Sequence, residues 1–280
     1  VMSLLKEIDN NGETSVLEIY NLAAQSHVGV SFETSYYTSN ASGLSMLNIL
    51  DSVRNLGMVK YTKIYQASTS EMFGGDKGTA PQNEMTTFVP KSPYAVAKLF
   101  AHNMMKVYRE SYGMFNCCGI LFNHSDVTRG ENFILRKISV EVNKIMKNPN
   151  HVMYLGNLNA KRDIGYSKDY VYGMWLMMQQ KTPDDYVLAT GKTHTIREFV
   201  EMAFKSVNID VKWKGEGLEE IGYDEKTNRV LVKVLERYFR PNEVHELCGD
   251  YTKAKNKLGW EPKVNVKTLL SIMVKHDSNV

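Results

Sequence analysis

The fold is indicated most clearly by the run Ser92-Pro93-Tyr94-Ala95-Val96-Ala97-Lys98. Serine followed by proline is typical of a helix start, with Ser92 as the N-cap and Pro93 at the first helical position. Residues four apart lie on one face of a helix, so the phenol of Tyr94 and the ammonium of Lys98 can meet. A nearby ammonium favours the phenolate. We therefore expect the pKa of Tyr94 to fall from about 10 toward neutrality, which suits a general base.

A strand and a polar turn precede this helix. The apolar stretch 61–67 predicts a strand, and the turn Ser68-Thr69-Ser70-Glu71 follows it. Ligands of open α/β sheets bind where strands end, so we expect Thr69 and Glu71 to lie beside Tyr94. Each residue alone also fits a structural role, such as a capping pair or a solvated lysine. Together, a hydroxyl, a carboxylate and a phenol beside a cation favour redox chemistry with proton abstraction.

Strands alternate with helices on both sides of this run. In the first half we expect strands at 17–22, 61–67 and 116–122 and helices at 36–56 and 93–112. This alternation predicts an α/β fold, with a Rossmann-like doubly wound parallel sheet covered on both faces. His124 follows the third strand at the same carboxyl edge, although a lone histidine is more often structural.

The second half has a looser pattern. Helices are expected at 132–146, 168–180, 195–207, 250–258 and 266–274, with strands at 153–155 and 186–189 and an irregular or two-stranded excursion at 213–235. We predict a smaller mixed α/β C-terminal lobe that binds substrate. Residues 1–150 then form the Rossmann domain and residues 151–280 most of the substrate lobe, with the lobes interleaved. Arg162 and Arg240 are either solvated charges or clamps for a phosphate.

No glycine-rich phosphate-binding turn follows a strand. Gly74, Gly75 and Gly78 lead to no expected helix, so we interpret them as a turn. Nucleotide-binding sheets normally open with a strand, a glycine-rich turn and a helix that receives the pyrophosphate. We therefore expect the chain to begin inside such a domain, with the first βαβ unit missing. Low stability or aggregation of the isolated chain is the corresponding prediction.

Composition excludes several classes of protein. The net charge is +3 and no basic run occurs, so nucleic acid is not an expected partner. Three cysteines, two of them adjacent, indicate neither a disulfide framework nor a metal site, and the seven histidines are not paired. No apolar stretch approaches the ~20 residues that span a bilayer, and the N-terminus has no signal-peptide pattern. The cytoplasm is the expected compartment.

Six stretches carry a resemblance to a known family. The chain resembles the GDP-mannose 4,6-dehydratases, which belong to the extended short-chain dehydrogenase/reductases. The matching stretches are Ile19-Tyr-Asn-Leu-Ala-Ala-Gln-Ser-His-Val28, Tyr65-Gln-Ala-Ser-Thr-Ser-Glu71, Ser92-Pro-Tyr94, Gly119-Ile-Leu-Phe-Asn-His124, Leu155-Gly-Asn-Leu-Asn-Ala-Lys-Arg-Asp163 and Tyr238-Phe-Arg-Pro-Asn-Glu-Val244.

The resemblance implies an NADP-dependent lyase that converts GDP-D-mannose to GDP-4-dehydro-6-deoxy-D-mannose, the first step toward GDP-L-fucose. Tyr94, held by Lys98, takes the proton of the 4-hydroxyl, and Thr69 hydrogen-bonds the 4-oxygen. Glu71 removes the C5 proton as water leaves C6. A carboxylate at position 71 separates this family from the related sugar epimerases, which need no C5 base.

The same resemblance implies further site residues and partners. The cofactor set is Leu22, Ala23, Ala24, Gln25, Ser26, Tyr37, Lys98, His124 and Arg129. The substrate set is Asn123, Lys137, Arg162, Arg240 and Glu243. A homodimer or homotetramer is implied as well. After His124 the chain reads Ser125-Asp126-Val127-Thr128-Arg129-Gly130, where the family usually reads Glu-Ser-Pro-Arg-Arg-Gly. The alternative is a truncated, non-catalytic relative that binds a GDP-sugar or a full-length subunit.

Overall fold

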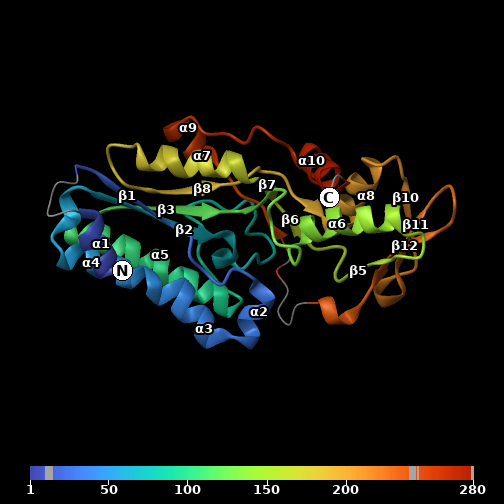
Figure 1. Ribbon diagram of the computed structural model, residues 1–280, viewed down its shortest axis with the longest axis horizontal. Coiled ribbons are helices and arrows are strands. Elements are labelled where there is room, and N and C mark those ends of the chain that lie inside the picture. Colours follow the sequence, from blue (N-terminus) through green and yellow to red (C-terminus); the bar gives the residue numbers. More distant parts are fainter. Residues whose placement is uncertain (10–14, 240–243, 245, 279–280) are drawn as a thin grey trace.

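The computed structural model describes residues 1–9, 15–239, 244 and 246–278. Two lobes lie end to end along the long axis of the molecule (Figure 1). The first lobe contains a sheet in the order β1-β2-β3-β8, in which each pair of neighbours is parallel. Its strands are β1 (Leu17–Asn21), β2 (Thr62–Thr69), β3 (Phe115–Leu121) and β8 (Asp185–Leu188). The prediction of a Rossmann-like parallel sheet is confirmed.

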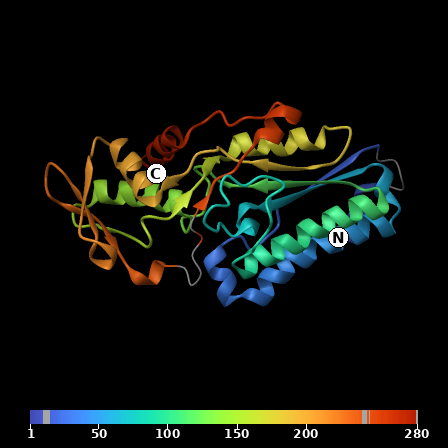
Figure 2. The ribbon, with the colours of Figure 1, turned by 180° about the vertical axis from the view of Figure 1, so that it is seen from behind.

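Helices cover both faces of this sheet, as Figures 1 and 2 show. The helices α4 (Ser45–Asn55) and α5 (Pro93–Tyr112) pack on one face through an apolar cluster that includes Leu50, Met105 and Ile64. On the other face α7 (Ser167–Met178) and α9 (Thr252–Leu258) form a second cluster with Trp260. Because both faces are buried, β2 and β3 consist of nearly continuous buried residues rather than an alternating pattern.

The helix expected at 36–56 is interrupted by a π turn. It consists of α3 (Ser35–Ser39), a π-helical segment (Asn40–Leu44) and α4. The π segment packs closely on α5, because a Cβ added at Gly43 would lie 3.1 Å from the carbonyl oxygen of Ala97. Side-chain periodicity does not reveal a single inserted residue of this kind, so the sequence predicted one continuous helix.

The second lobe contains a sheet in the order β10-β11-β12-β5. Its strands are β10 (Val211–Lys214), β11 (Ile221–Asp224), β12 (Val230–Val234) and β5 (Met153–Leu155), and the helices α6 (Ile134–Lys147), α8 (Ile196–Lys205) and α10 (Val266–Ser278) share its apolar core. The irregular or two-stranded excursion expected at 213–235 contains the paired strands β11 and β12, but a third strand, β10, begins before it at Val211 and pairs with β11. The charged turn at Asp224–Asn228 hides the hairpin pattern, with Thr227 Oγ1 donating 2.7 Å to Asp224 and Asn228 at a φ of 57°.

Short strands join the lobes. They are β4 (Asn123–Ser125) with β7 (Ile164–Tyr166), and β6 (Lys161–Arg162) between β13 (Glu246–Leu247) and β9 (His194–Thr195). Sequence analysis missed them because two or three residues carry no periodicity. Although residue 150 was the expected boundary, α6 packs in the core of the second lobe and β8 extends the sheet of the first.

The remaining elements are short. They are α1 (Met2–Asp9), α2 (Val28–Glu33) and four 3₁₀ turns at Met58–Lys60, Ser70–Phe73, Gly217–Glu219 and Glu236–Tyr238. Within the described ranges no helix is both long and apolar enough to cross a membrane. The same residues contain no group of three or more histidine, cysteine or acidic side chains that could hold a metal ion.

Candidate active site

A cavity of about 1070 Å³ opens beyond the carboxyl ends of β2 and β3. Residues of both lobes line it, among them Thr69, Glu71 and Tyr94 from the first lobe and Arg162 and Tyr238 from the second. This is the sheet edge at which ligands bind in open α/β folds. The three residues predicted to act together therefore share one cavity.

Thr69 ends β2, and Glu71 belongs to the 3₁₀ turn that follows. The backbone N–H of Glu71 donates 3.2 Å to Thr69 Oγ1, which fixes the threonine side chain beside the turn. Both side chains are largely buried, with exposed fractions of 8% for Thr69 and 6% for Glu71. A hydroxyl and a carboxylate are thus held together at the wall of the cavity.

Tyr94 lies in the first turn of α5. As predicted, Pro93 starts this helix and Ser92 caps it, accepting a 3.2 Å hydrogen bond from the N–H of Ala95. The side chain of Thr69 lies close enough to the phenol of Tyr94 to lower its pKa. Because Thr69 Oγ1 already accepts from Glu71 N–H, its own proton is available for the tyrosine oxygen. The Ser92 cap therefore positions the phenol of Tyr94 beside the Thr69 hydroxyl.

The predicted effect of Lys98 on Tyr94 was wrong. Burial raises the pKa of Tyr94 to about 12, although the side chain of Thr69 opposes the rise; the charge of Glu71 adds to it and that of Arg129 opposes it. Burial also lowers the pKa of Lys98 to about 8. Its ammonium lies 6.0 Å from the centroid of the Tyr94 ring and donates 2.9 Å to the carbonyl oxygen of Ala67. Desolvation disfavours both charges, and this outweighs their attraction.

His124 and Asn123 follow β3 in the short strand β4. The imidazole of His124 stacks on Tyr170 with centroids 4.7 Å apart, and its Nδ1 lies 3.1 Å from the carbonyl oxygen of Phe122. Burial lowers the pKa of His124 to about 4, so the ring is neutral. Since a carbonyl only accepts, Nδ1 carries the proton and Nε2 is left as an acceptor. Asn123 Nδ2 is buried without a hydrogen-bond partner among the described residues, which leaves a donor available at the cavity.

Arg129 lies on the loop after β4. Its guanidinium stacks on the ring of Phe133 at 3.7 Å, and Phe133 in turn packs against His27 with centroids 5.6 Å apart. All three residues line the cavity. Since its charge lowers the pKa of Tyr94, Arg129 rather than Lys98 supplies the cation that favours the phenolate.

Two cations from the second-lobe side also line the cavity. Lys137 Nζ donates 2.6 Å to the carbonyl oxygen of Tyr154 and lies 3.7 Å from the ring centroid of Tyr238. Arg162 is 6% exposed and donates 2.9 Å to the carbonyl oxygen of Val244. A buried and a half-buried cation beside an open cavity suit an anionic ligand such as a diphosphate.

Comparisons with known proteins identify the family. The family model described as GDP-mannose 4,6 dehydratase matches residues 11–273. This chain belongs to the GDP-mannose 4,6-dehydratase family. It is 52% identical over 260 residues to the Dictyostelium discoideum member, covering 93% of this chain and 73% of that one. Identity to the Homo sapiens member is 47% over 265 residues, covering 95% and 71%.

Solved structures share the fold of this GDP-mannose 4,6-dehydratase family member. RMD from Pseudomonas aeruginosa, solved with NADPH, superposes with a TM-score of 0.79 at 17% identity, covering 96% of this chain and 84% of that one. The dTDP-glucose 4,6-dehydratase of Bacillus anthracis, solved with NAD, has a TM-score of 0.76 at 18% identity, covering 98% and 76%. They support the Rossmann-like α/β fold of this chain.

The residues implied by family resemblance are only partly gathered at the cavity. Those that line it are Leu22, Ala24, Ser26, Lys98, Asn123, His124, Arg129, Lys137 and Arg162. Ala23, Gln25 and Tyr37 are not among the lining residues; the Gln25 side chain accepts from Thr38 and the Tyr37 side chain is 63% exposed. Arg240 and Glu243 lie outside the described residues.

Sequence reasoning missed other residues of this site. His27, Phe133 and Tyr238 line the cavity, and Ser68 makes a buried hydrogen bond with His102 behind it. His27 and Tyr238 stand in the stretches that carry the family resemblance, which was their only signal. Nothing in the local pattern marked Phe133 or His102, because His27, which packs on Phe133, and Ser68, which bonds His102, come from distant parts of the chain.

Proposed function

We propose that this protein is a GDP-mannose 4,6-dehydratase that converts GDP-D-mannose to GDP-4-dehydro-6-deoxy-D-mannose. One observation carries the proposal: Thr69, Glu71 and Tyr94 line one cavity in a member of this family. The net reaction is the loss of water from the sugar and leaves its overall oxidation state unchanged. It is the first step toward GDP-L-fucose.

NADP is the proposed cofactor, and the residues at the sheet edge fit it. The neutral acceptor Nε2 of His124 and the buried ammonium of Lys98 suit the amide and hydroxyl groups of a nicotinamide nucleoside. When bound, NADP supplies an acceptor and then a donor of hydride. Leu22, Ala24, Ser26 and Arg129 are further proposed contacts from the cavity wall, and Ala23, Gln25 and Tyr37 remain proposals from family resemblance.

Tyr94 is proposed to take the proton of the sugar 4-hydroxyl. The side chain of Thr69 and the positive charge of Arg129 both favour the phenolate that this step requires. When the sugar is bound, the Thr69 hydroxyl can turn its one proton from Tyr94 to the sugar 4-oxygen and stabilise the charge that develops there. Lys98 holds the carbonyl of Ala67 and keeps the backbone before Thr69 in place.

Glu71 is proposed to remove the C5 proton. Once C4 is a ketone, the adjacent C–H is acidic, and a carboxylate within the same cavity can take this proton while the C6 hydroxyl departs as water. The backbone of Glu71 is fixed by its hydrogen bond to Thr69. The base for C5 and the hydroxyl for the 4-oxygen are therefore positioned by one turn.

The GDP moiety is proposed to lie on the second-lobe side of the cavity. Lys137 and Arg162 supply positive charge there, and Asn123 supplies a donor. Arg240 and Glu243 join this set on family resemblance. Charge-assisted hydrogen bonds to phosphate oxygens are among the strongest that proteins make, so these residues suit the diphosphate.

Incubation with GDP-mannose and NADP tests the activity. The expected result is a 4-keto, 6-deoxy product with no net consumption of NADP, detected by mass spectrometry and the absorbance of the ketone in alkali. A folded protein that binds both ligands and yields no product would rule the activity out. That result would favour the non-catalytic alternative, which family membership does not favour.

A Glu71→Gln variant tests the base. We expect it to retain oxidation at C4 but to lose water elimination, so reduced cofactor and a 4-keto hexose accumulate. Glu84→Gln is the matched control, because Glu84 is a partly buried carboxylate that accepts 2.7 Å from Val187 N–H and does not line the cavity. Normal dehydration by Glu71→Gln would refute the assignment.

A homodimer or homotetramer is proposed for the assembly. Val96, Phe100 and Val107 form an exposed apolar stripe on α5, with exposed fractions of 55%, 39% and 47%. Their spacing places them on one helix face, which a second copy can cover. Light scattering should give the mass of a dimer or a larger assembly, and Phe100→Glu should shift that mass toward the monomer.

The cytoplasm is the proposed compartment, since all three cysteines are free.

A further inference from the structure

Three residues of α5 form a row that faces the end of β2. Tyr94, Lys98 and His102 are spaced by four, so they lie on one helix face. Their exposed fractions are 9%, 2% and 5%. Each meets one residue of the strand end: Tyr94 lies beside Thr69, which lowers its pKa, Lys98 donates to the carbonyl of Ala67, and His102 is hydrogen-bonded to Ser68. The third contact has no part in the mechanism above.

The His102 contact is a buried polar pair. Its Nδ1 lies 3.0 Å from Ser68 Oγ, and Ser68 is 3% exposed. Burial lowers the pKa of His102, so the ring is neutral. The ring of Phe88 packs edge-on against the imidazole at 5.2 Å and limits its rotation. A hydrogen bond of this kind, shielded from water, is directional and stays formed.

Ser68 immediately precedes Thr69. Successive side chains of an extended strand point in opposite directions, so holding Ser68 sets the rotation of the strand about its own axis. That rotation decides where the Thr69 hydroxyl points. An error of about 1 Å in such a group lowers the rate of a positioned reaction markedly.

We propose that His102 is a positioning residue: through Ser68 it directs the Thr69 hydroxyl at Tyr94 and at the N–H of Glu71. It touches neither substrate nor cofactor. Its effect on turnover rests on the proposed function, whereas its effect on the Thr69 turn does not.

Kinetics of three variants test the role. His102→Leu keeps the side-chain bulk and removes the hydrogen bond, whereas His102→Asn keeps a polar atom near the place of Nδ1. We expect His102→Leu to lower kcat about tenfold while KM for GDP-mannose stays within about twofold of the parent value. In His102→Asn most of the kcat should be restored. Met105→Ala, another buried change on α5, should lower the melting temperature and leave kcat unchanged. Equal kcat in His102→Leu and the parent, or a loss shared by Met105→Ala, overturns the proposal.

Amide exchange provides a test that needs no activity. The N–H of Glu71 donates to Thr69 Oγ1, so it is protected while Thr69 is held in place. We expect this amide to exchange about tenfold faster in His102→Leu and in Ser68→Ala, and to recover in His102→Asn. The amide of Val200 in α8 should not change. Unaltered exchange at Glu71 overturns the inference even if the enzyme is active, and faster exchange supports it even if the proposed function fails.

Discussion

The ammonium of Lys98 donates a 2.9 Å hydrogen bond to the carbonyl oxygen of Ala67, two residues before Thr69. The side chain is 2% exposed, and burial lowers its pKa from 10.5 to about 8. Lys98 therefore acts first on the backbone of β2. Its charge is costly to bury, and this has a measurable consequence.

Removing Lys98 should change how stability depends on pH. The unfolded chain binds a proton at Lys98 between pH 8 and 10.5 that the folded chain does not, so folding becomes more favourable as pH rises through this window. The gain is about 3 kcal/mol by pH 10.5. The melting temperature of the parent minus that of Lys98→Met should therefore rise as pH increases from 8 to 10.5. The exposed Lys106→Met is the control, and a difference flat from pH 7 to 10.5 contradicts the prediction.

Removing Arg129 should raise the pKa of Tyr94 further, because its charge opposes the rise caused by burial. A general base with a higher pKa is less ionised at a given pH. We expect Arg129→Met to lower kcat about tenfold at pH 8 and to move the acid limb of the rate profile, along which the rate rises as Tyr94 ionises, upward by about one pH unit. Arg54→Met, on the surface of α4, serves as control. An unshifted limb argues against this role.

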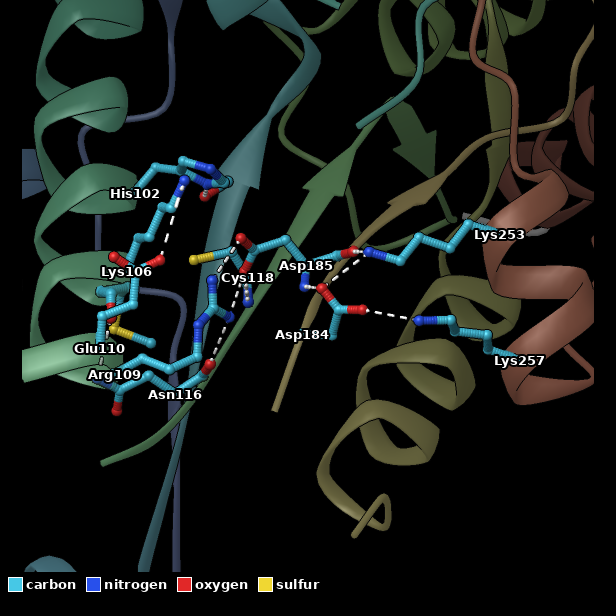
Figure 3. Close-up of polar contacts among 12 residues, drawn as sticks. His102, Lys106, Arg109, Glu110, Asn116, Cys118, Asp184, Asp185, Lys253 and Lys257 are labelled. Atoms are coloured by element: carbon cyan, nitrogen blue, oxygen red, sulfur yellow. Dashed lines mark hydrogen bonds and ion pairs between the residues drawn. The ribbon is translucent and has the colours of Figure 1, made fainter. Parts of the chain in front are cut away.

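The pair Arg109–Asp185 should stabilise the junction of α5, β3 and β8. Arg109 meets Asp185 with two hydrogen bonds of 2.9 and 2.8 Å and also donates to Asn116 O (Figure 3). Arg109→Met leaves a mostly buried carboxylate unpaired, which should cost about 3–5 kcal/mol in denaturant titrations. Breaking the exposed pair of Lys106 and Glu110, 4.0 Å apart, should cost less than about 1 kcal/mol.

The same pair should make the stability of the protein depend on pH in the acid range. Burial alone raises the pKa of Asp185, but the hydrogen bonds from Arg109 outweigh it and hold the pKa below its usual value. The stabilisation is therefore present above about pH 3.9 and is lost as pH falls through the folded-state pKa. As pH falls below about 3.9, Arg109→Met should lose less free energy of unfolding than the parent does.

Asp163 should couple stability to substrate binding. It is fully buried and accepts from Thr190 N–H and hydroxyl at 2.9 and 2.6 Å, from Gly191 N–H at 2.9 Å and from Gly249 N–H at 3.2 Å. In Asp163→Asn one carboxylate oxygen becomes an NH₂ group, which cannot accept from these donors. We therefore expect the free energy of unfolding to fall by about 2–3 kcal/mol. Because Arg162 precedes it, KM for GDP-mannose should rise.

Asp169→Asn is the matched control for this prediction. Asp169 also accepts two backbone N–H groups, at 2.9 and 3.0 Å, but it does not line the cavity. It should lose less stability and keep its KM. An equal rise of KM in both variants contradicts the link through Arg162.

Much of the first lobe was predictable because its signals are local. The Ser92-Pro93 start of α5, the strand before Thr69 and the parallel sheet each follow from a few neighbouring residues. The proximity of Thr69, Glu71 and Tyr94 followed from the rule that ligands bind where parallel strands end. The domain boundary, the stability of the isolated chain and the assembly stay predictions.

The errors arose where distant segments meet. Of the three strands within 211–234, β12 pairs with β5, where Val232 lies opposite Met153, 79 residues earlier. The strands β4, β6, β7, β9 and β13 are too short to show a pattern. The predicted direction of the pKa shift of Tyr94 was wrong, because the spacing of Tyr94 and Lys98 says nothing about how deeply both are buried.

The order of apolar and polar residues along this chain determined by itself the main strands and helices of the first lobe, and hence which side chains reach the edge of its sheet. Only the tertiary structure decided which partner each of those side chains takes and whether it carries a charge. The physical reason is that periodicity and capping act between close neighbours, whereas desolvation and hydrogen-bond partners depend on every segment packed around a group.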